Sequence, residues 1–372
     1  MNEIFDRVLQ AARKLGASDV HLKVGLPPVF RIRGVLRTLK DVPPMTSEVV
    51  MTFAMNIMND TIHEKFMREH EVDLAYATAD GLRYRVNVFR QRGETGMVMR
   101  VIAADIPPFE RLNLPQRVRE LALEHRGLIL VTGITGSGKS TTMASLLNLV
   151  NYERAAHVIT IEDPIEYVFR DHRSVINQRE LGFDTNSFSA ALRSALRQDP
   201  DVVFVGEMRD LETIQTALLA AETGHLVFST LHTLDAQETI NRIVQMFPTH
   251  QQTGIRLQVG AILTGVVSQR LLPRADGRGM IPAVEIMINT PRIRDLIVDA
   301  TRTHEIVDAI KEGAHPYGMV SFDQSLTDLV QRQLVTYEMA IAASTNPDDF
   351  ALYFRGVSSG QEQAGLQVDS GF

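Results

Sequence analysis

A glycine-rich segment, GITGSGKST at residues 133–141, carries residue types that bind phosphate. Four residues separate Gly133 from Gly138, and Lys139 and Ser140 follow directly, which is the spacing of a phosphate-binding loop. Glycines let backbone N–H groups approach a phosphate, because no Cβ stands in the way. The lysine can then reach the outer phosphates, and the serine hydroxyl can ligate Mg²⁺. The alternative, an ordinary Gly/Ser turn before a helix, does not explain an unbroken motif. We expect these residues to contact a nucleotide: Gly133, Thr135, Gly136, Ser137, Gly138, Lys139, Ser140 and Thr141.

Two later segments place carboxylates at the ends of apolar strands. In TIEDPIE (160–166) the carboxylates crowd together, and Glu162 is placed to act as a base or to orient water. From the spacing alone, a solvated charged turn explains this segment equally well. In DVVFVGEMRD (201–210), Glu207 follows an apolar strand, which is where such folds place an acid near Mg²⁺. There a functional role is the better interpretation.

Two further clusters carry titratable groups. His225 and His232 bracket the apolar run in HLVFSTLHT, seven residues apart. A metal pair would need more ligands nearby, so a hydrogen-bonding sensor of the γ-phosphate is the functional hypothesis; singly, a histidine is more often structural. Arginines 83, 85, 90, 92 and 100 gather in one stretch with a single acid, Glu94, and on composition alone this is a solvated basic face.

The elements around these residues predict a parallel α/β core. An apolar strand at 128–132 precedes the glycine loop, and a helix at 140–150 follows it. Further strands at 157–162, 202–205 and 226–230 alternate with helices, one of which is capped by Asp210. Beyond Pro248 helices are expected to dominate, apart from a strand at 281–288.

The remaining sequence suggests the division into domains. Residues 1–104 predict a small α+β domain, residues 105–117 a proline-containing linker, and residues 118–355 the nucleotide-binding α/β domain with C-terminal helices. The last stretch, 356–372, has the composition of a disordered tail.

Composition excludes several classes of protein. The 372-residue chain has no cysteine, so disulfides and thiolate metal sites are excluded, which fits a reducing cytosol. Its net charge of −7 argues against a nucleic-acid partner. The longest apolar runs are too short to span a membrane, so membrane association would need a partner or the protein surface.

Together these motifs resemble a known family, the secretion ATPases of type II secretion and type IV pili. GITGSGKS, TIEDPIE, DPDVVFVGEMRD and GHLVFSTLHT are similar, in this order, to the Walker A, Asp box, Walker B and His box of the family. NQRELG (177–182) and ALRQDPD (195–201) match too, and the similarity covers about residues 1–355. The resemblance implies a PAS-like N-terminal domain, a RecA-like P-loop ATPase core with a C-terminal helical module, and a homohexameric ring.

The same resemblance implies roles for individual residues. Glu162 would be the base, Glu207 would hold Mg²⁺ through water with Ser140, and Lys139 would bind ATP. His225 and His232 would belong to the catalytic set, and Arg85 and Arg100 would reach the nucleotide. RIRDLI (292–297) is similar to a late motif of the members that retract pili. The absence of a four-cysteine zinc site also separates the chain from many extension members.

The implied function is therefore Mg-ATP hydrolysis coupled to pilus retraction and twitching motility. The implied location is cytoplasmic, peripheral at the inner membrane, with an inner-membrane pilus platform protein as partner. Three alternatives stay open: an accessory retraction ATPase, a RecA-type nucleic-acid translocase, and a nucleotide-gated assembly protein that hardly hydrolyses ATP.

Overall fold

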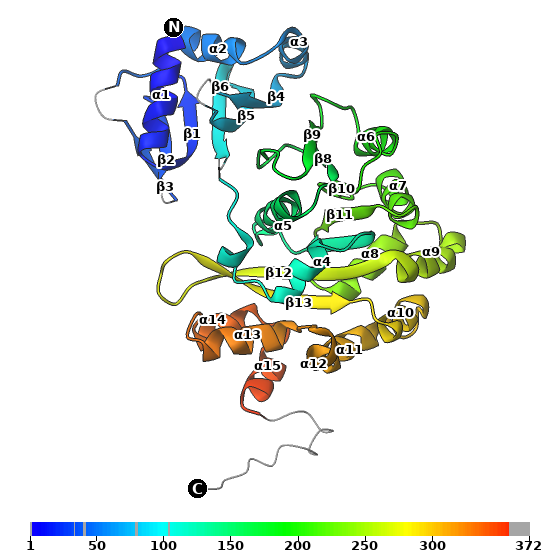
Figure 1. The fold of residues 1–372 in the computed structure, drawn as a ribbon. Coiled ribbons are helices and arrows are strands. Elements are labelled where there is room, and N and C mark those ends of the chain that lie inside the picture. Colours follow the sequence, from blue (N-terminus) through cyan, green and yellow to red (C-terminus); the bar gives the residue numbers. More distant parts are fainter. Residues whose placement is uncertain (1, 33, 40–41, 79–80, 103–104, 357–372) are drawn as a thin grey trace. The chain divides into compact units, whose positions relative to one another are not determined.

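The structure is a computed structural model (Figure 1). It describes residues 2–32, 34–39, 42–78, 81–102 and 105–356. The chain divides into two compact units, Met1–Asp105 with Glu166–Val168, and Ile106–Ile165 with Phe169–Phe372. Apart from Gly356, the predicted disordered tail lies outside the described residues. Among the described residues, no helix combines the length and the apolar character that a membrane span requires.

The first unit is an antiparallel sheet with helices, as the sequence predicted. The sheet has the order β3-β2-β1-β6-β5-β4. Its strands alternate between buried and exposed positions, so apolar side chains such as Val86 and Met99 enter one core with Phe5 and Phe53 of the helices. The elements are α1 (Asn2–Lys14), β1 (Ala17–Lys23), β2 (Val29–Ile32), β3 (Val35–Thr38), α2 (Ser47–Asn56), α3 (Asp60–Glu69), β4 (Glu71–Ala77), β5 (Arg83–Gln91) and β6 (Glu94–Ile102).

The second unit is built on a sheet with the order β13-β12-β7-β11-β10-β8-β9. All neighbouring strands pair in parallel except β13, which runs antiparallel to β12. This arrangement confirms the predicted α/β class. The strands are β7 (Gly127–Thr132), β8 (His157–Glu162), β9 (Val175–Glu180), β10 (Val202–Val205), β11 (Leu226–Leu231), β12 (Leu263–Pro273) and β13 (Met280–Ile288).

The helices of the second unit alternate with the strands and then follow them. The elements are η1 (Phe109–Arg111), α4 (Gln116–Ala122), α5 (Lys139–Glu153), α6 (Phe188–Ala195), α7 (Leu211–Glu222), α8 (Ala236–Gln245), α9 (Thr249–Ile262), α10 (Pro291–Val298), η2 (Thr303–Glu305), α11 (Ile306–Glu312), α12 (Ala314–Tyr317), α13 (Phe322–Gln331), α14 (Tyr337–Ala343) and α15 (Pro347–Phe354).

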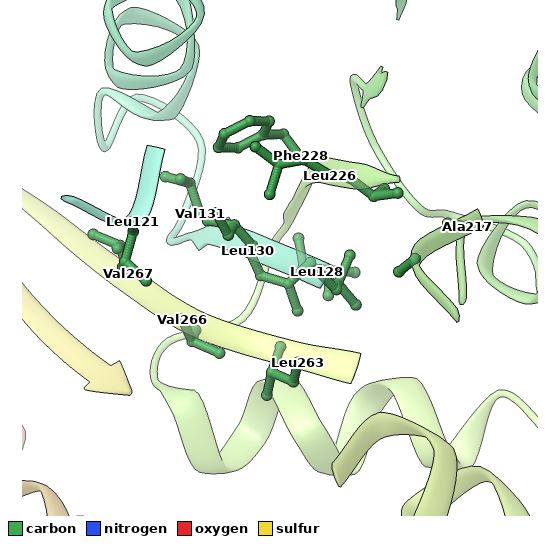
Figure 2. Packing of buried hydrophobic residues seen from close by; sticks show 14 of the residues in the cluster. Leu121, Leu128, Leu130, Val131, Ala217, Leu226, Phe228, Leu263, Val266 and Val267 are labelled. Atoms are coloured by element: carbon green, nitrogen blue, oxygen red, sulfur yellow. The ribbon is translucent and has the colours of Figure 1, made fainter. Parts of the chain in front are cut away.

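The centre of the second unit is apolar on both faces of the sheet. Every residue of β7 and β11 is buried. Figure 2 shows Leu128 and Leu130 of β7 packed among Phe228 of β11 and Val266 of β12. Continuous apolar runs of this kind are typical of parallel strands covered on both faces. A second cluster, which includes Phe322 and Phe350, joins α13–α15 to β12 and β13.

Two strands were not predicted from the sequence, and the expectation of a single strand beyond Pro248 was wrong. In β12 two polar side chains bond to other segments: Ser268 Oγ accepts from Thr132 Oγ1 at 2.9 Å, and Gln269 Nε2 donates to Thr142 Oγ1 at 3.0 Å. These contacts offset the cost of burying polar groups. The edge strand β9, VINQRE, has no apolar run from which a strand could be predicted.

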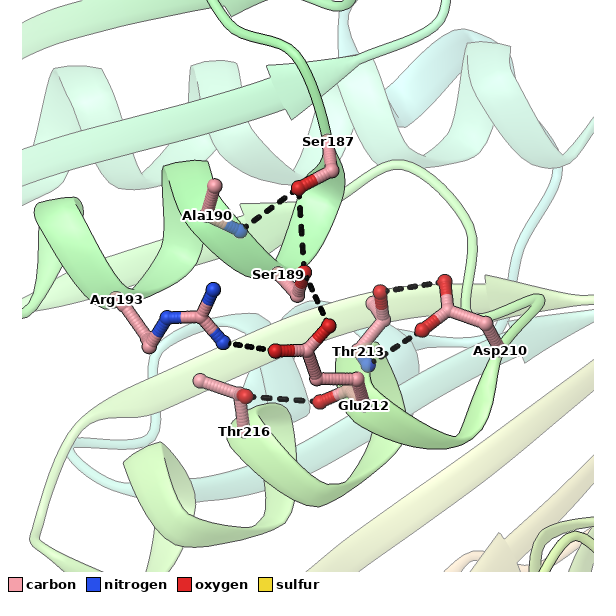
Figure 3. Close-up of polar contacts among 8 residues, drawn as sticks. All are labelled: Ser187, Ser189, Ala190, Arg193, Asp210, Glu212, Thr213 and Thr216. Carbon is pink, nitrogen blue, oxygen red and sulfur yellow. Dashed lines mark hydrogen bonds and ion pairs between the residues drawn. The ribbon is translucent and has the colours of Figure 1, made fainter.

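The start of α7 shows how a polar cap fixes an element next to the candidate site (Figure 3). Asp210 accepts a hydrogen bond from Thr213 N at 2.8 Å and another from Thr213 Oγ1 at 2.7 Å. Beside it, Arg193 of α6 pairs with Glu212 at an exposed position. The capping interaction therefore satisfies a buried threonine, whereas the ion pair lies in solvent.

We expect Asp210→Ala to lower stability by about 1–2 kcal/mol, because it removes the cap and leaves the Thr213 hydroxyl without its acceptor. The urea concentration at the midpoint of unfolding measures the effect. Arg193→Ala is the control: it removes only the exposed ion pair, so its midpoint should shift less. Equal shifts would contradict this account of α7.

Candidate active site

The glycine loop connects β7 to α5 in an unusual backbone conformation. Gly133, Gly136 and Gly138 have φ angles of 142°, 81° and 92°, which L-residues with side chains rarely adopt. At Gly133 a Cβ would also lie 2.4 Å from the carbonyl oxygen of Gln269. Two independent constraints therefore require glycine at this position.

Lys139 begins α5 and turns back over the loop. Its Nζ donates to the carbonyl oxygens of Gly133 at 2.7 Å and Ile134 at 3.0 Å, and the residue is only 8% exposed. The N-terminus of α5, which carries a partial positive charge, and the ammonium group of Lys139 thus both lie at the glycine loop. A phosphate group is the ligand that this combination suits.

The other loop residues differ in exposure. Thr135, Gly136 and Ser140 are exposed, Gly138 and Thr141 are half-buried, and Ser137 is buried. The Oγ of Ser137 has no hydrogen-bond partner among the described residues. The exposed backbone of the loop and the Ser140 hydroxyl are accessible to a nucleotide and its metal ion, so these residues fit Mg-ATP.

Glu162 ends β8 and is 8% exposed. Its Oε1 accepts hydrogen bonds from Thr160 Oγ1 at 2.7 Å and from Gln178 Nε2 at 3.2 Å. A buried carboxylate held by donors is an oriented acceptor for a proton, which is what a general base requires. Gln178 was not singled out from the sequence, because only the unpredicted strand β9 brings it to Glu162.

Glu207 follows β10 and lies between two cationic or potentially cationic groups. Its carboxylate contacts Arg209 Nη2 at 2.8 Å and His232 Nε2 at 3.3 Å. The hydrogen bond to Glu207 raises the pKa of Arg209 above its ordinary value. Burial lowers this pKa, but its effect is smaller. The structure thus brings Glu207 and His232 together, as their places after neighbouring parallel strands allow.

These residues meet at one edge because the strands before them are parallel and in register. Ile161 lies opposite Val205, Val205 opposite Ser229, and Leu231 opposite Thr132. Glu162 ends its strand, and Gly133, Glu207 and His232 follow theirs within one or two residues. The carboxyl edge of an open α/β sheet is where such folds bind ligands.

His225 is not brought to this edge. It precedes β11, and its neighbour Leu226 lies opposite Gly127, at the start of β7. The length of a six-residue strand, about 20 Å, separates the two ends. Its Nδ1 lies 2.9 Å from the carbonyl oxygen of Ala220 and 3.2 Å from Thr223 Oγ1. Within its own subunit His225 therefore lies apart from the phosphate loop.

Arg85 and Arg100 belong to the first unit, where they face each other across β5 and β6. Arg100 Nε donates to Asp19 Oδ1 at 2.9 Å. Burial raises the pKa of Asp19, but hydrogen bonds from Arg100 and Ser18 outweigh it, so the pKa lies below its ordinary value. Arg85 is exposed and makes no ion pair within the described part of the chain. Of the two arginines, Arg85 has the side chain available for an external anion.

The late motif RIRDLI lies on α10, as predicted. Thr290 caps the helix and Pro291 occupies its first turn. Ile293 and Ile297 are fully buried, whereas Arg294 is exposed. The arginine is therefore accessible from solvent while the apolar residues hold the helix.

A cavity of about 500 Å³ lies elsewhere in the second unit, lined mainly by residues of the C-terminal helices. Burial raises the pKa of Glu285 in its wall to about 7, although the hydrogen bond from Ala236 N opposes this. Its lining contains none of the site residues predicted from the sequence.

The fold and the site define a parallel α/β protein with a phosphate-binding loop, the class of P-loop nucleotide-binding proteins. A family model described as Type II/IV secretion system protein matches residues 1–311, and the chain belongs to this family.

Relatives in this family cover most of the chain. It is 43% identical over 343 residues to the type IV pilus retraction ATPase PilT of Pseudomonas aeruginosa, covering 92% of this chain and 98% of the relative. It is 36% identical over 351 residues to the type IV pilus ATPase PilU of the same organism, covering 94% of this chain and 91% of the relative. A crystal structure of the pilus retraction motor PilT with bound ADP has a TM-score of 0.85 and 46% identity, covering 92% of this chain and 97% of that one.

We expect Gly133→Ala to weaken ATP binding by about tenfold or more, because its Cβ would clash with the carbonyl oxygen of Gln269 and force the loop out of its conformation, in addition to the backbone strain. Equilibrium titration with a fluorescent ATP analogue measures the affinity. Gly136→Ala is the matched control, since nothing lies within 4 Å of its Cβ position and only backbone strain is added. If Gly133→Ala bound ATP as tightly as the unmodified protein, the loop would not be the phosphate site.

Proposed function

We propose that this protein is an ATPase motor that couples Mg-ATP hydrolysis to retraction of type IV pili, the disassembly of pilin that drives twitching motility. The observation that carries the proposal is the common carboxyl edge, where the glycine loop, Glu162 and the Glu207–His232 pair follow neighbouring parallel strands. The 43% identity with a relative named as a pilus retraction ATPase supports the cellular task.

The proposed division of labour follows from the placement of the side chains. Lys139 and the loop N–H groups bind the phosphates of ATP, with Gly133, Thr135, Gly136, Ser137, Gly138, Ser140 and Thr141 around them. Ser140 and, through water, Glu207 would hold Mg²⁺, which supplies neutralising charge for the phosphates. Glu162 accepts a proton from the attacking water, and His232 holds the Glu207 carboxylate. His225 lies at the opposite, amino edge of the sheet, so it takes no part in the chemistry at the carboxyl edge of its own subunit.

We further propose a homohexameric ring in which Arg85 and Arg100 act on the nucleotide of a neighbouring subunit. Arginines supplied in trans stabilise phosphoryl transfer, and head-to-tail contacts can close into rings. The exposed Arg85 suits this task. Arg100 is held by its ion pair with Asp19, which lies opposite it on the neighbouring strand β1.

We place the motor in the cytoplasm, peripherally at the inner membrane, with a pilus platform protein as the membrane partner. The domain division that we propose is 1–104, a linker at 105–117, 118–355 and a tail at 356–372. A second candidate function is that of an accessory retraction ATPase, which the 36% identity with PilU supports. The higher identity with PilT favours the principal motor.

We expect Glu162→Gln to keep nucleotide binding and to lower ATP turnover by about 100-fold or more, because the amide keeps the size of the side chain and removes its basicity. A phosphate-release assay at saturating Mg-ATP measures the turnover. Glu207→Gln is the comparison, and its loss should be relieved in part by higher Mg²⁺ concentrations. Normal hydrolysis by Glu162→Gln together with an inactive Glu207→Gln would exchange the two roles.

Mixing two inactive variants tests the action in trans. Rings assembled from Lys139→Ala and Arg85→Ala subunits contain interfaces at which one neighbour supplies an intact loop and the other an intact arginine. We expect ATP hydrolysis to reappear on mixing, although each variant alone is inactive. Mixed rings verified by two affinity tags that stay inactive would argue against a neighbour's arginine.

A further inference from the structure

The carboxylate of Glu162 is held by two donors that come from facing strands. Thr160 lies on β8 and Gln178 lies directly opposite it on β9. Both side chains donate to the same oxygen of Glu162, Oε1, at 2.7 Å and 3.2 Å. Two converging donors fix the rotation of a carboxylate more narrowly than one.

The orientation of the Gln178 amide follows from its second hydrogen bond. Its Oε1 accepts from Phe169 N at 2.9 Å. A backbone N–H can only donate, so the amide oxygen must face Phe169, and the NH₂ group must face Glu162. The amide therefore cannot flip without losing both hydrogen bonds.

The same strand also fastens the segment that follows Glu162. Two residues beyond Gln178, Glu180 accepts a hydrogen bond from Ile165 N at 3.2 Å. Gln178 and Glu180 share one face of β9, because side chains alternate along a strand. The segment from Asp163 to Phe169 is thus held at two points by β9, and one of these points is the amide that also holds Glu162.

We propose that Gln178 is a positioning residue for hydrolysis: its amide orients the Glu162 carboxylate and fixes it to the backbone at Phe169. This inference rests on the proposed function, in which Glu162 accepts the proton of the attacking water. Donors to a carboxylate favour its charged form, and a small displacement of a base lowers the rate sharply. The polar side chains of the edge strand β9 would then serve to position Glu162 and the segment that follows it.

Gln178→Glu tests the two hydrogen bonds of the Gln178 amide separately, because it keeps the one from Phe169 N and removes the one to Glu162. The new carboxylate still accepts from Phe169 N, but in its charged form it cannot donate to Glu162. We expect kcat for ATP to fall by about 10- to 100-fold with the affinity for a fluorescent ATP analogue unchanged, and we expect repulsion between the two carboxylates to lower the thermal unfolding midpoint at neutral pH but not at acid pH. The matched control is Asn177→Asp, the same chemical change one residue earlier, where the side chain contacts His157 instead of Glu162. Its kcat should stay near that of the unmodified protein.

Two further readouts separate positioning from a structural role. As the pH is lowered, the introduced carboxyl group protonates and can donate again, so the deficit of Gln178→Glu relative to Asn177→Asp should narrow. Thr160→Val, which removes the other donor, should also lower kcat. The inference is overturned if Gln178→Glu keeps full kcat while the unmodified protein hydrolyses ATP, or if affinity and unfolding midpoint fall together with kcat at every pH. An unmodified protein without hydrolysis would overturn the proposed function itself, and this inference with it.

Discussion

The parallel register of four neighbouring strands, β7, β11, β10 and β8, is the constraint on which the candidate site depends. Parallel strands end at the same edge, so residues far apart in the sequence meet there. Glu162 is the last residue of β8, and Gly133, Glu207 and His232 follow the other three strands within one or two residues. A one-residue slip of any strand would turn its side chains to the opposite face and move its carboxylate away from the loop.

Two charged groups at this edge are buried, and each is held by partners. Lys139 and Glu162 are each 8% exposed, and burial of a charge is costly unless polar groups surround it. Loop carbonyls surround the ammonium group, and the hydroxyl of Thr160 and the amide of Gln178 contact the carboxylate. The continuous apolar packing of β7 and β11 provides a rigid base for these groups. The charged groups of the site are therefore held in place by contacts within the chain.

The sequence predicted the elements whose local signals were strong. Apolar runs gave β7, β10 and β11, and the cap Asp210 gave the start of α7. It failed for β9 and β12, in which polar side chains such as Gln178 and Gln269 donate to residues distant in the sequence. For the same reason Gln178 was missed. His225 and His232 looked equivalent in the sequence, but a buried strand separates opposite edges of a sheet, and only His232 reaches Glu207.

The central claim is that hydrolysis at the carboxyl edge drives retraction of pili. The most direct measurement is fluorescence imaging of labelled pili in cells that lack this gene and carry either the unmodified gene or the Lys139→Ala variant. The account predicts that pili extend in both strains and retract only with the unmodified gene. Normal retraction in cells without the gene, or with the Lys139→Ala variant as the only copy, would contradict it.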